Sequence, residues 1–185
     1  MQRQKSATTA LIAINVAIYL LSIIGIGTVY QLGIFERAMI DGHQWYRLFT
    51  ALFSHFSIPH ILCNSIALFS IGPIVETAIG AKRFLTIYLL GGILGNFIAM
   101  VFHGVLQPNV LMAGASMSIF AILGHLVHVY LNRKRLFYYG FSSKFLRGII
   151  ITFILSSLGG GDFIGHFCGF IAGVIMSVLF VRQRA

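Results

Sequence analysis

Two polar residues inside strongly apolar stretches of this sequence have the types needed for acyl transfer. Ser116 follows the small residues Gly114 and Ala115 in the stretch MAGASMSIFAILGH, and His166 lies in a second apolar stretch. A serine hydroxyl becomes an effective nucleophile when a neighbouring base accepts its proton, and a neutral histidine suits that task. The pair therefore predicts Ser116 as a nucleophile with His166 as its general base.

Two further polar residues, His60 and Asn64, are suited to stabilise the negative charge that such a reaction develops. They are one helical turn apart and offer side-chain donors on the same helix face. The backbone N–H of Ser116, at the expected start of a helix, offers a third donor. The set matches the nucleophile, base and oxyanion roles of acyl transfer. Asp162, four residues before His166, is either an orienting acid or a solvated loop carboxylate.

The composition of the chain indicates the environment of this chemistry. Of the 185 residues, 58% are hydrophobic and 9% are charged, whereas soluble domains carry roughly 25% charged residues. Such a composition is typical of a membrane protein. Six apolar runs, near the length that a spanning helix needs, cover roughly 7–26, 59–79, 84–104, 115–131, 147–160 and 165–181. We expect an all-α, polytopic membrane protein with six transmembrane helices, folded as a single domain over residues 1–185.

The longest connection, between the first and second apolar runs, mixes charged, aromatic and apolar residues at helical spacing. It extends from about Gly27 to Pro59. We expect short helices that lie at the membrane surface, with Trp45 and Tyr46 at the level of the lipid headgroups. Arg47 is expected to anchor this long loop at the interface.

The basic residues are distributed unevenly along the chain. With six alternating spans, Arg37 and Arg47 fall on one side of the membrane and the rest of the 13 Lys and Arg fall on the other. The positive-inside rule then predicts a multi-pass protein of the cell membrane with both termini in the cytoplasm. Topology accounts for the net charge of +9, so we expect lipid rather than nucleic acid as the surrounding partner.

The expected spans bring the polar residues to one depth. Ser116, His166 and His60 each stand about 16 residues before the first charge at the other end of their run. At about 1.5 Å per residue, all three lie about 25 Å above the cytoplasmic edge and a few Å below the outer surface. Ionisable groups inside a membrane are candidates for function. For any one of them, a packing hydrogen bond between helices is the alternative.

Small residues predict how two of these runs pack. Gly165, Gly169, Gly173 and Ser177 recur at every fourth position and form one smooth helix face. If this face meets the run that begins at Ser116, then His166 and Ser116 come together. The alternative is close helix packing without chemistry.

Four sequence stretches, taken in order, resemble the rhomboid family of intramembrane serine proteases: QWYRLFT, HFSIPHILCN, GASMS and GHFCGFIAG. The resemblance assigns the family's serine and histidine to Ser116 and His166, and its H-x-x-x-N pair to His60 and Asn64. The supporting positions that it implies are Trp45, Arg47, His55, Glu76, Gly114, Phe120, Gly169 and Gly173.

The chain departs from the family pattern at two positions. Met117 replaces the glycine that usually follows the serine, and its side chain is expected to narrow the site or change the preferred substrate residue. Phe120 replaces a frequent tyrosine and is expected to keep the ring that stacks near the histidine while losing the hydroxyl. Both reacting groups are retained, so we expect an active enzyme.

The resemblance implies a Ser–His dyad that cleaves transmembrane segments of other membrane proteins near their outer ends, in a site open to the outer side. The fifth span and loop 159–163 are the expected gate and cap. The alternatives are a catalytically inactive relative that binds transmembrane clients, and a small transporter, for which the chain lacks internal repeats. His43, His103, His125 and His128 lack metal-site spacing, so we expect no metal and no other cofactor.

Overall fold

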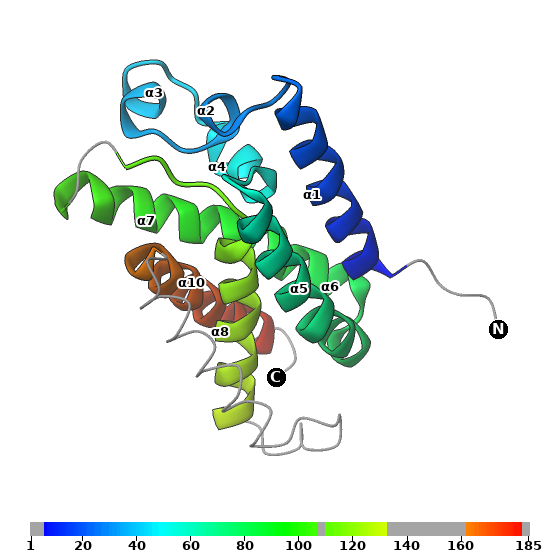
Figure 1. Cartoon of the computed structure of the whole chain (residues 1–185). Helices are drawn as coiled ribbons and strands as arrows, with labels where there is room; N and C mark the ends of the chain where they lie inside the picture. Colours follow the sequence, from blue (N-terminus) through cyan, green and yellow to red (C-terminus); the bar gives the residue numbers. More distant parts are fainter. Residues whose placement is uncertain (1–5, 107–109, 133–161, 183–185) are drawn as a thin grey trace.

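The structure, a computed structural model, describes residues 6–106, 110–132 and 162–182 (Figure 1). Within these residues the ordered elements are helical apart from one isolated antiparallel bridge between Ile34 and Met112, which confirms the all-α class. The helices are α1 (Ala7–Ile23), α2 (Val29–Leu32), α3 (Glu36–Ile40), α4 (Arg47–Thr50), α5 (Ile58–Ile79), α6 (Ala81–Thr86), α7 (Gly92–Leu106), α8 (Ser116–Asn132) and α10 (Phe163–Arg182), with a 3₁₀ turn at Ala51–Phe53 and a π-helical stretch at Ile87–Gly91.

The apolar helices correspond to five of the six expected spans. Helix α5 and the continuous helical segment Ala81–Leu106 are long and apolar enough to cross a membrane, and the other three apolar helices are shorter. The first helix ends at Ile23 rather than near residue 26, because the chain turns at Gly25, whose φ is +87°. The expected fifth span, 147–160, and residues 159–161 of the expected gate loop lie outside the described residues. The count of six spans stays a prediction.

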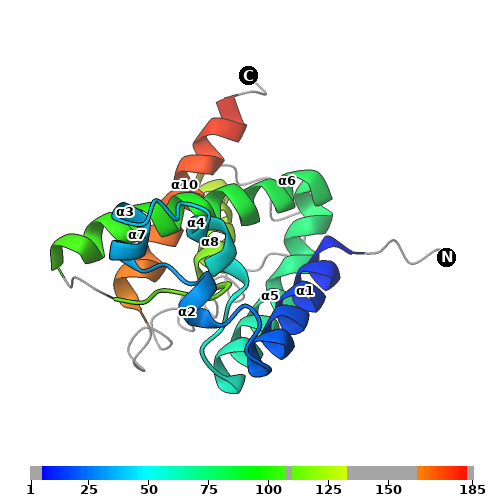
Figure 2. The same ribbon diagram turned by 90° about the horizontal axis from the view of Figure 1, so that it is seen from above.

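Helix α8 forms the centre of the helix assembly. All its side chains from Met117 to Leu126 are buried. It contacts α5, α7, α10 and the π-helical stretch, while α1 lies beside α5 at the edge of the bundle (Figures 1 and 2). Ser116 is the first residue of α8, so it begins a helix that other helices surround.

Helices α8 and α10 approach each other through small residues, as the small-residue face predicts. A Cβ atom added to Gly173 would lie 2.6 Å from the carbonyl carbon of Ala121, and one added to Gly169 would lie 2.7 Å from the carbonyl oxygen of Met117. These neighbours are backbone atoms, so a side chain at Gly173 would separate the two helices. At the other end of α10, Ser177 Oγ lies 2.8 Å from His128 Nδ1.

The long connection between α1 and α5 folds into short helices, as expected. Arg47 is buried within it, and its guanidinium donates to the carbonyl oxygens of Tyr30 at 2.9 Å and Gly33 at 2.6 Å. Trp45 and Tyr46 remain exposed. Arg47 therefore ties together two parts of the connection, while the aromatic side chains face outward.

The start of α1 is joined to the end of α5 by a single carboxylate. Glu76, near the end of α5, accepts hydrogen bonds from Ser6 Oγ at 2.7 Å, from the backbone N–H groups of Ala7 and Thr8 at 2.7 and 3.0 Å, and from Thr8 Oγ1 at 2.8 Å. The N–H groups in the first turn of a helix have no partner within the helix. Glu76 satisfies two of them from a neighbouring helix and so fixes where α1 begins.

Candidate active site

The segment that leads into Ser116 is held in place by backbone hydrogen bonds to the long connection. Ile34 and Met112 exchange two of them, at 2.8 and 2.9 Å, and Gly114 N–H donates to the carbonyl oxygen of Ala51 at 2.9 Å. Gly114 has a φ of +128°, a conformation that side-chain-bearing residues rarely adopt. The turn therefore requires glycine at this position for its backbone geometry.

Gly114 also lies directly against the two polar residues of α5. A Cβ atom added to it would lie 2.7 Å from Cε1 and 2.8 Å from Nε2 of His60, and 3.4 Å from Nδ2 of Asn64. The structure thus brings the predicted oxyanion donors on α5 beside the turn that ends at Ser116. Any side chain at position 114 would occupy the space between the turn and these two donors.

The amide group of Asn64 contains a buried donor that lacks a partner among the described residues. Asn64 is only 8% exposed, and its Nδ2 atom has no hydrogen-bond partner among the residues that the structure describes. A buried donor without a partner costs about 1–3 kcal/mol and calls for a reason. A bound acceptor, such as a substrate oxygen, would supply the missing partner.

His55 stands behind these groups as a supporting residue. It is buried, its Nε2 accepts a long hydrogen bond of 3.4 Å from Ala115 N–H, and its ring meets the His60 ring edge-on at a centroid distance of 5.1 Å. Burial, followed by the nearby His60, lowers the pKa of His55 from 6.5 to about 4. His55 is therefore neutral near pH 7, as an acceptor at Nε2 must be.

The predicted base lies on α10 and faces the first turns of α8. His166 is 8% exposed, and its ring centroid lies 4.2 Å from that of Phe120. Phe120 is one helical turn after the half-buried Ser116, so the imidazole stands against the face of α8 that carries the serine. The expected contact between the Phe120 ring and the His166 ring is present, and phenylalanine supplies it without a hydroxyl group.

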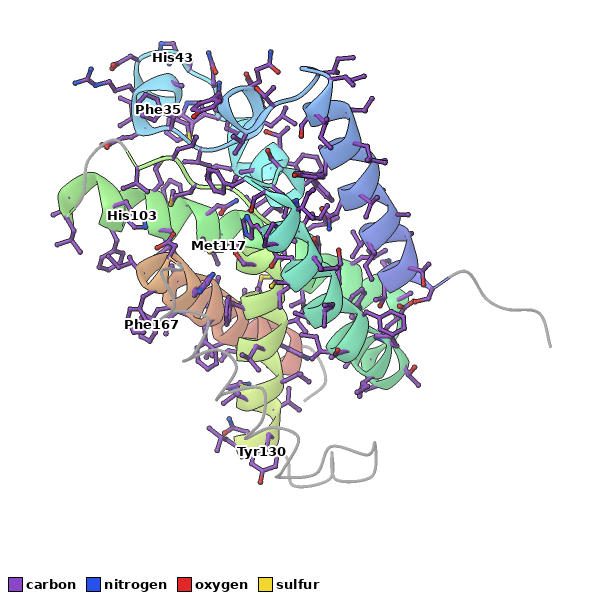
Figure 3. The ribbon with its side chains drawn as sticks, in the orientation of Figure 1. Phe35, His43, His103, Met117, Tyr130 and Phe167 are labelled. Atoms are coloured by element: carbon purple, nitrogen blue, oxygen red, sulfur yellow. The ribbon has the colours of Figure 1, made fainter. Side chains whose placement is uncertain are left out.

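Met117, one of the two departures from the family pattern, is buried between helices. A Cβ atom on Gly95 or Gly169 would lie 3.2 Å from its Cγ or Sδ atom, and one on Gly165 would lie 2.8 Å from its Cε atom. The side chain therefore fills the space between α7 and α10 (Figure 3). In the structure its role is packing beneath the turn of α10 that carries His166.

Asp162 has partners other than a catalytic histidine ring. Its Oδ1 atom lies 2.9 Å from His103 Nε2 and accepts a hydrogen bond of 2.8 Å from Gly165 N–H. From the sequence, His103 was considered only as a possible metal ligand. The depth argument that singled out Ser116 and His166 would have found it, because it is a polar residue near the outer end of an apolar run.

The predicted residues therefore fall into two groups. The structure gathers His55, His60, Asn64 and Gly114 on one side, and Phe120, His166 and Gly169 on the other, with Ser116 at the start of the helix between them. Gly173 lies two turns along α10 from His166. Trp45 and Arg47 belong to the long connection, where Arg47 binds loop carbonyl groups. A serine flanked by donors and a histidine is the arrangement that acyl transfer requires.

Comparison with known proteins decides the family. The family model described as the Rhomboid domain matches residues 42–183. The chain belongs to the rhomboid family. This rhomboid is 36% identical over 152 residues to rhomboid protease GluP of Bacillus subtilis (strain 168), which covers 79% of this chain and 28% of GluP. The chain is 29% identical over 161 residues to a protein of the same strain described as "Putative rhomboid protease YdcA", and the match covers 85% of this chain and 75% of YdcA.

A further relative of this rhomboid comes from Toxoplasma gondii. Rhomboid-like protease 3 of Toxoplasma gondii is 30% identical over 162 residues, covering 84% of this chain and 59% of the relative. The chain thus spans between about a quarter and three quarters of the length of these proteins. Membership of the family makes it a polytopic membrane protein related to proteases.

Proposed function

We propose that this chain is a serine-type endopeptidase that cleaves transmembrane segments of other membrane proteins by a Ser–His dyad. The protease relatives support the reaction class. The observation that carries the proposal is the buried amide of Asn64, which has no partner among the described residues and lies beside the turn into Ser116. An oxyanion site needs a donor of this kind, already desolvated and aimed at the position where charge develops.

The proposed mechanism gives each of these side chains one role. Ser116 Oγ attacks the carbonyl carbon of the scissile bond while His166 accepts the hydroxyl proton. Asn64, His60 and the Ser116 N–H group donate hydrogen bonds to the oxyanion. His166 then transfers the proton to the leaving amine, and the C–N bond breaks to give an acyl-enzyme. Water, deprotonated by His166, attacks the ester and releases the carboxylate product with regeneration of Ser116.

The expected orientation sets the substrate class. With both termini in the cytoplasm of a cell-membrane protein, the site opens to the outer side, where water for the second step is available because the lipid supplies none. The peptide bonds cleaved then lie near the outer ends of transmembrane substrates. A small substrate residue before the scissile bond and helix-breaking residues nearby favour exposure of that bond.

Covalent labelling tests this proposal. The purified protein in detergent is treated with a fluorophosphonate, and the labelled residue is identified by mass spectrometry. We expect labelling at Ser116 that is abolished in Ser116→Ala and His166→Ala. The matched control is Ser118→Ala, because Ser118 lies on the same helix turn but is fully buried against Gly92. It should be labelled at Ser116 like the wild type.

The main alternative is a catalytically inactive rhomboid that binds transmembrane clients. Folded wild-type protein that is not labelled, and that nevertheless retains a transmembrane peptide in a pull-down, would replace the protease proposal with this one.

A further inference from the structure

The first turn of α10 is joined to the end of α7 by one side-chain contact. His103, in the last turn of α7, approaches Asp162 with 2.9 Å between Nε2 and Oδ1. The His103 side chain is 6% exposed and that of Asp162 is 31% exposed. In Figure 3 His103 lies on the side of α7 that faces the start of α10. The two residues are 59 positions apart in the chain, so this contact connects elements that the sequence leaves separate.

Asp162 also organises the turn that contains His166. Its Oδ1 atom accepts a hydrogen bond from Gly165 N–H, and its backbone carbonyl oxygen accepts one of 2.9 Å from His166 N–H. An acidic side chain in this position caps a helix and favours its N-terminal end. One residue therefore both begins the helix that carries His166 and attaches it to α7.

A second contact holds the same turn on the side that faces α8. The Cε atom of Met117, on α8, packs under Gly165, the residue before His166. A helix turn that is capped, attached to one neighbour and packed on another has little freedom to move. The backbone of His166 is thus held relative to both α7 and α8, and α8 is the helix that presents Ser116.

We propose that Asp162 and His103 are positioning residues that clamp the first turn of α10 and so set the distance between His166 and Ser116. This inference rests on the proposed protease function. It assigns Asp162 a role different from that of a triad acid, because the carboxylate acts on the helix backbone and on α7. A displacement of about 1 Å in a reacting group can cost 10²-fold in rate, so loss of the clamp acts on the chemical step.

The experiment measures the acylation of Ser116 by a fluorophosphonate in the 185-residue chain. The maximum rate and the half-saturating probe concentration are determined separately. We expect Asp162→Ala to lower the maximum rate about 100-fold with an unchanged half-saturating concentration. Asp162→Asn retains a side-chain oxygen that can accept the hydrogen bond from Gly165 N–H, so its maximum rate should fall less. His103→Ala should lose activity, whereas His103→Gln, which retains a donor to the carboxylate, should recover most of it.

Two controls separate positioning from simple instability. Asp41→Asn removes the same charge from an exposed position near the end of α3 and should leave the maximum rate unchanged. In the double variant His103→Ala/Asp162→Ala, the loss should be no greater than in the worse single variant, because both act through one contact. Additive losses, or a loss explained entirely by the unfolded fraction, would overturn the clamp.

A spectroscopic measurement distinguishes failure of this inference from failure of the proposed function. In ¹⁵N-histidine-labelled protein, the His166 ring signals, assigned by His166→Gln, should change in Asp162→Ala and stay unchanged in Asp41→Asn. If the wild type is not labelled by the probe but these signals change, the positioning role stands and the protease proposal falls. If the wild type is labelled while neither the rate nor the signals change in Asp162→Ala, the positioning role falls.

Discussion

Two asparagines on different helices contrast a donor available to a substrate with a donor used for packing. Asn64 Nδ2 has no partner among the described residues, whereas Asn96 Nδ2, on α7, donates to the carbonyl oxygen of Leu48 at 2.8 Å. Both side chains are buried. The difference in their partners leads to opposite expectations for the same substitution.

Asn64→Ala should remove activity without loss of stability. We expect the rate per folded molecule to fall about 10²–10³-fold, because one oxyanion donor is lost, while the melting temperature is at least that of the wild type. Asn96→Ala should do the reverse, since it leaves the Leu48 carbonyl unsatisfied at a cost of about 1–3 kcal/mol. Cleavage assays and thermal unfolding in detergent measure both. Equal stability losses in the two variants would contradict the assignment.

His55 predicts how stability depends on pH. Its pKa is lowered from 6.5 to about 4 in the folded protein. Between pH 6.5 and pH 4, His55 is therefore protonated in the unfolded chain and neutral in the folded protein. Stability therefore falls as the pH decreases from 6.5 to 4, by about 3 kcal/mol from this residue, and is insensitive to His55 above that window. The melting temperatures of the wild type and His55→Asn, plotted against pH, should differ in slope between pH 6.5 and pH 4. Parallel plots would exclude the effect.

At the scale of helices, the proposed dyad depends on the contact between α8, which begins at Ser116, and α10, which carries His166. This contact is tight because the neighbours of Gly173 are backbone atoms of Ala121. By contrast, the nearest neighbour of a Cβ atom at Gly104, on α7, would be the end of the flexible Glu36 side chain, at 2.7 Å. A carboxylate end can move aside, whereas a helix backbone cannot.

Gly173→Ala should therefore destabilise the protein and reduce activity together. We expect a loss of about 1–3 kcal/mol, typical of an overpacked core, because the added methyl group pushes α10 away from α8. Gly104→Ala is the matched control and should leave both properties near those of the wild type. Thermal unfolding and probe labelling measure the two effects. A Gly173→Ala protein with wild-type labelling would show that the helix separation does not position His166.

At the scale of the whole molecule, the distribution of charge predicts the orientation in the membrane. In a Cys63→Ser/Cys168→Ser background, Asp41→Cys on the long connection should react with an impermeant maleimide in intact cells. Lys82→Cys, in α6, should react only after lysis, because basic segments stay in the cytoplasm. Both positions are exposed in the structure. The opposite labelling pattern would place the dyad on the cytoplasmic side.

Much of the fold could be predicted from the sequence because membrane helices are recorded in local composition. The runs that begin near Ala7, Ser116 and Phe163 appear as helices within a few residues of their predicted starts. The boundary of the first run was less accurate, since a turn at Gly25 ends the helix where the apolar composition continues. Hydrophobicity reports the environment of a residue more directly than its backbone conformation.

The sequence by itself determined the helical membrane class, the family and the candidates for chemistry, because these depend on composition and short-range spacing. Only the tertiary structure decided that Asp162 pairs with His103, that Met117 packs beneath Gly165, and that Asn64 Nδ2 has no partner among the described residues. Each of these facts depends on how one helix is rotated and translated against another. Helical periodicity specifies which residues share a face, and packing between distant segments specifies what that face meets.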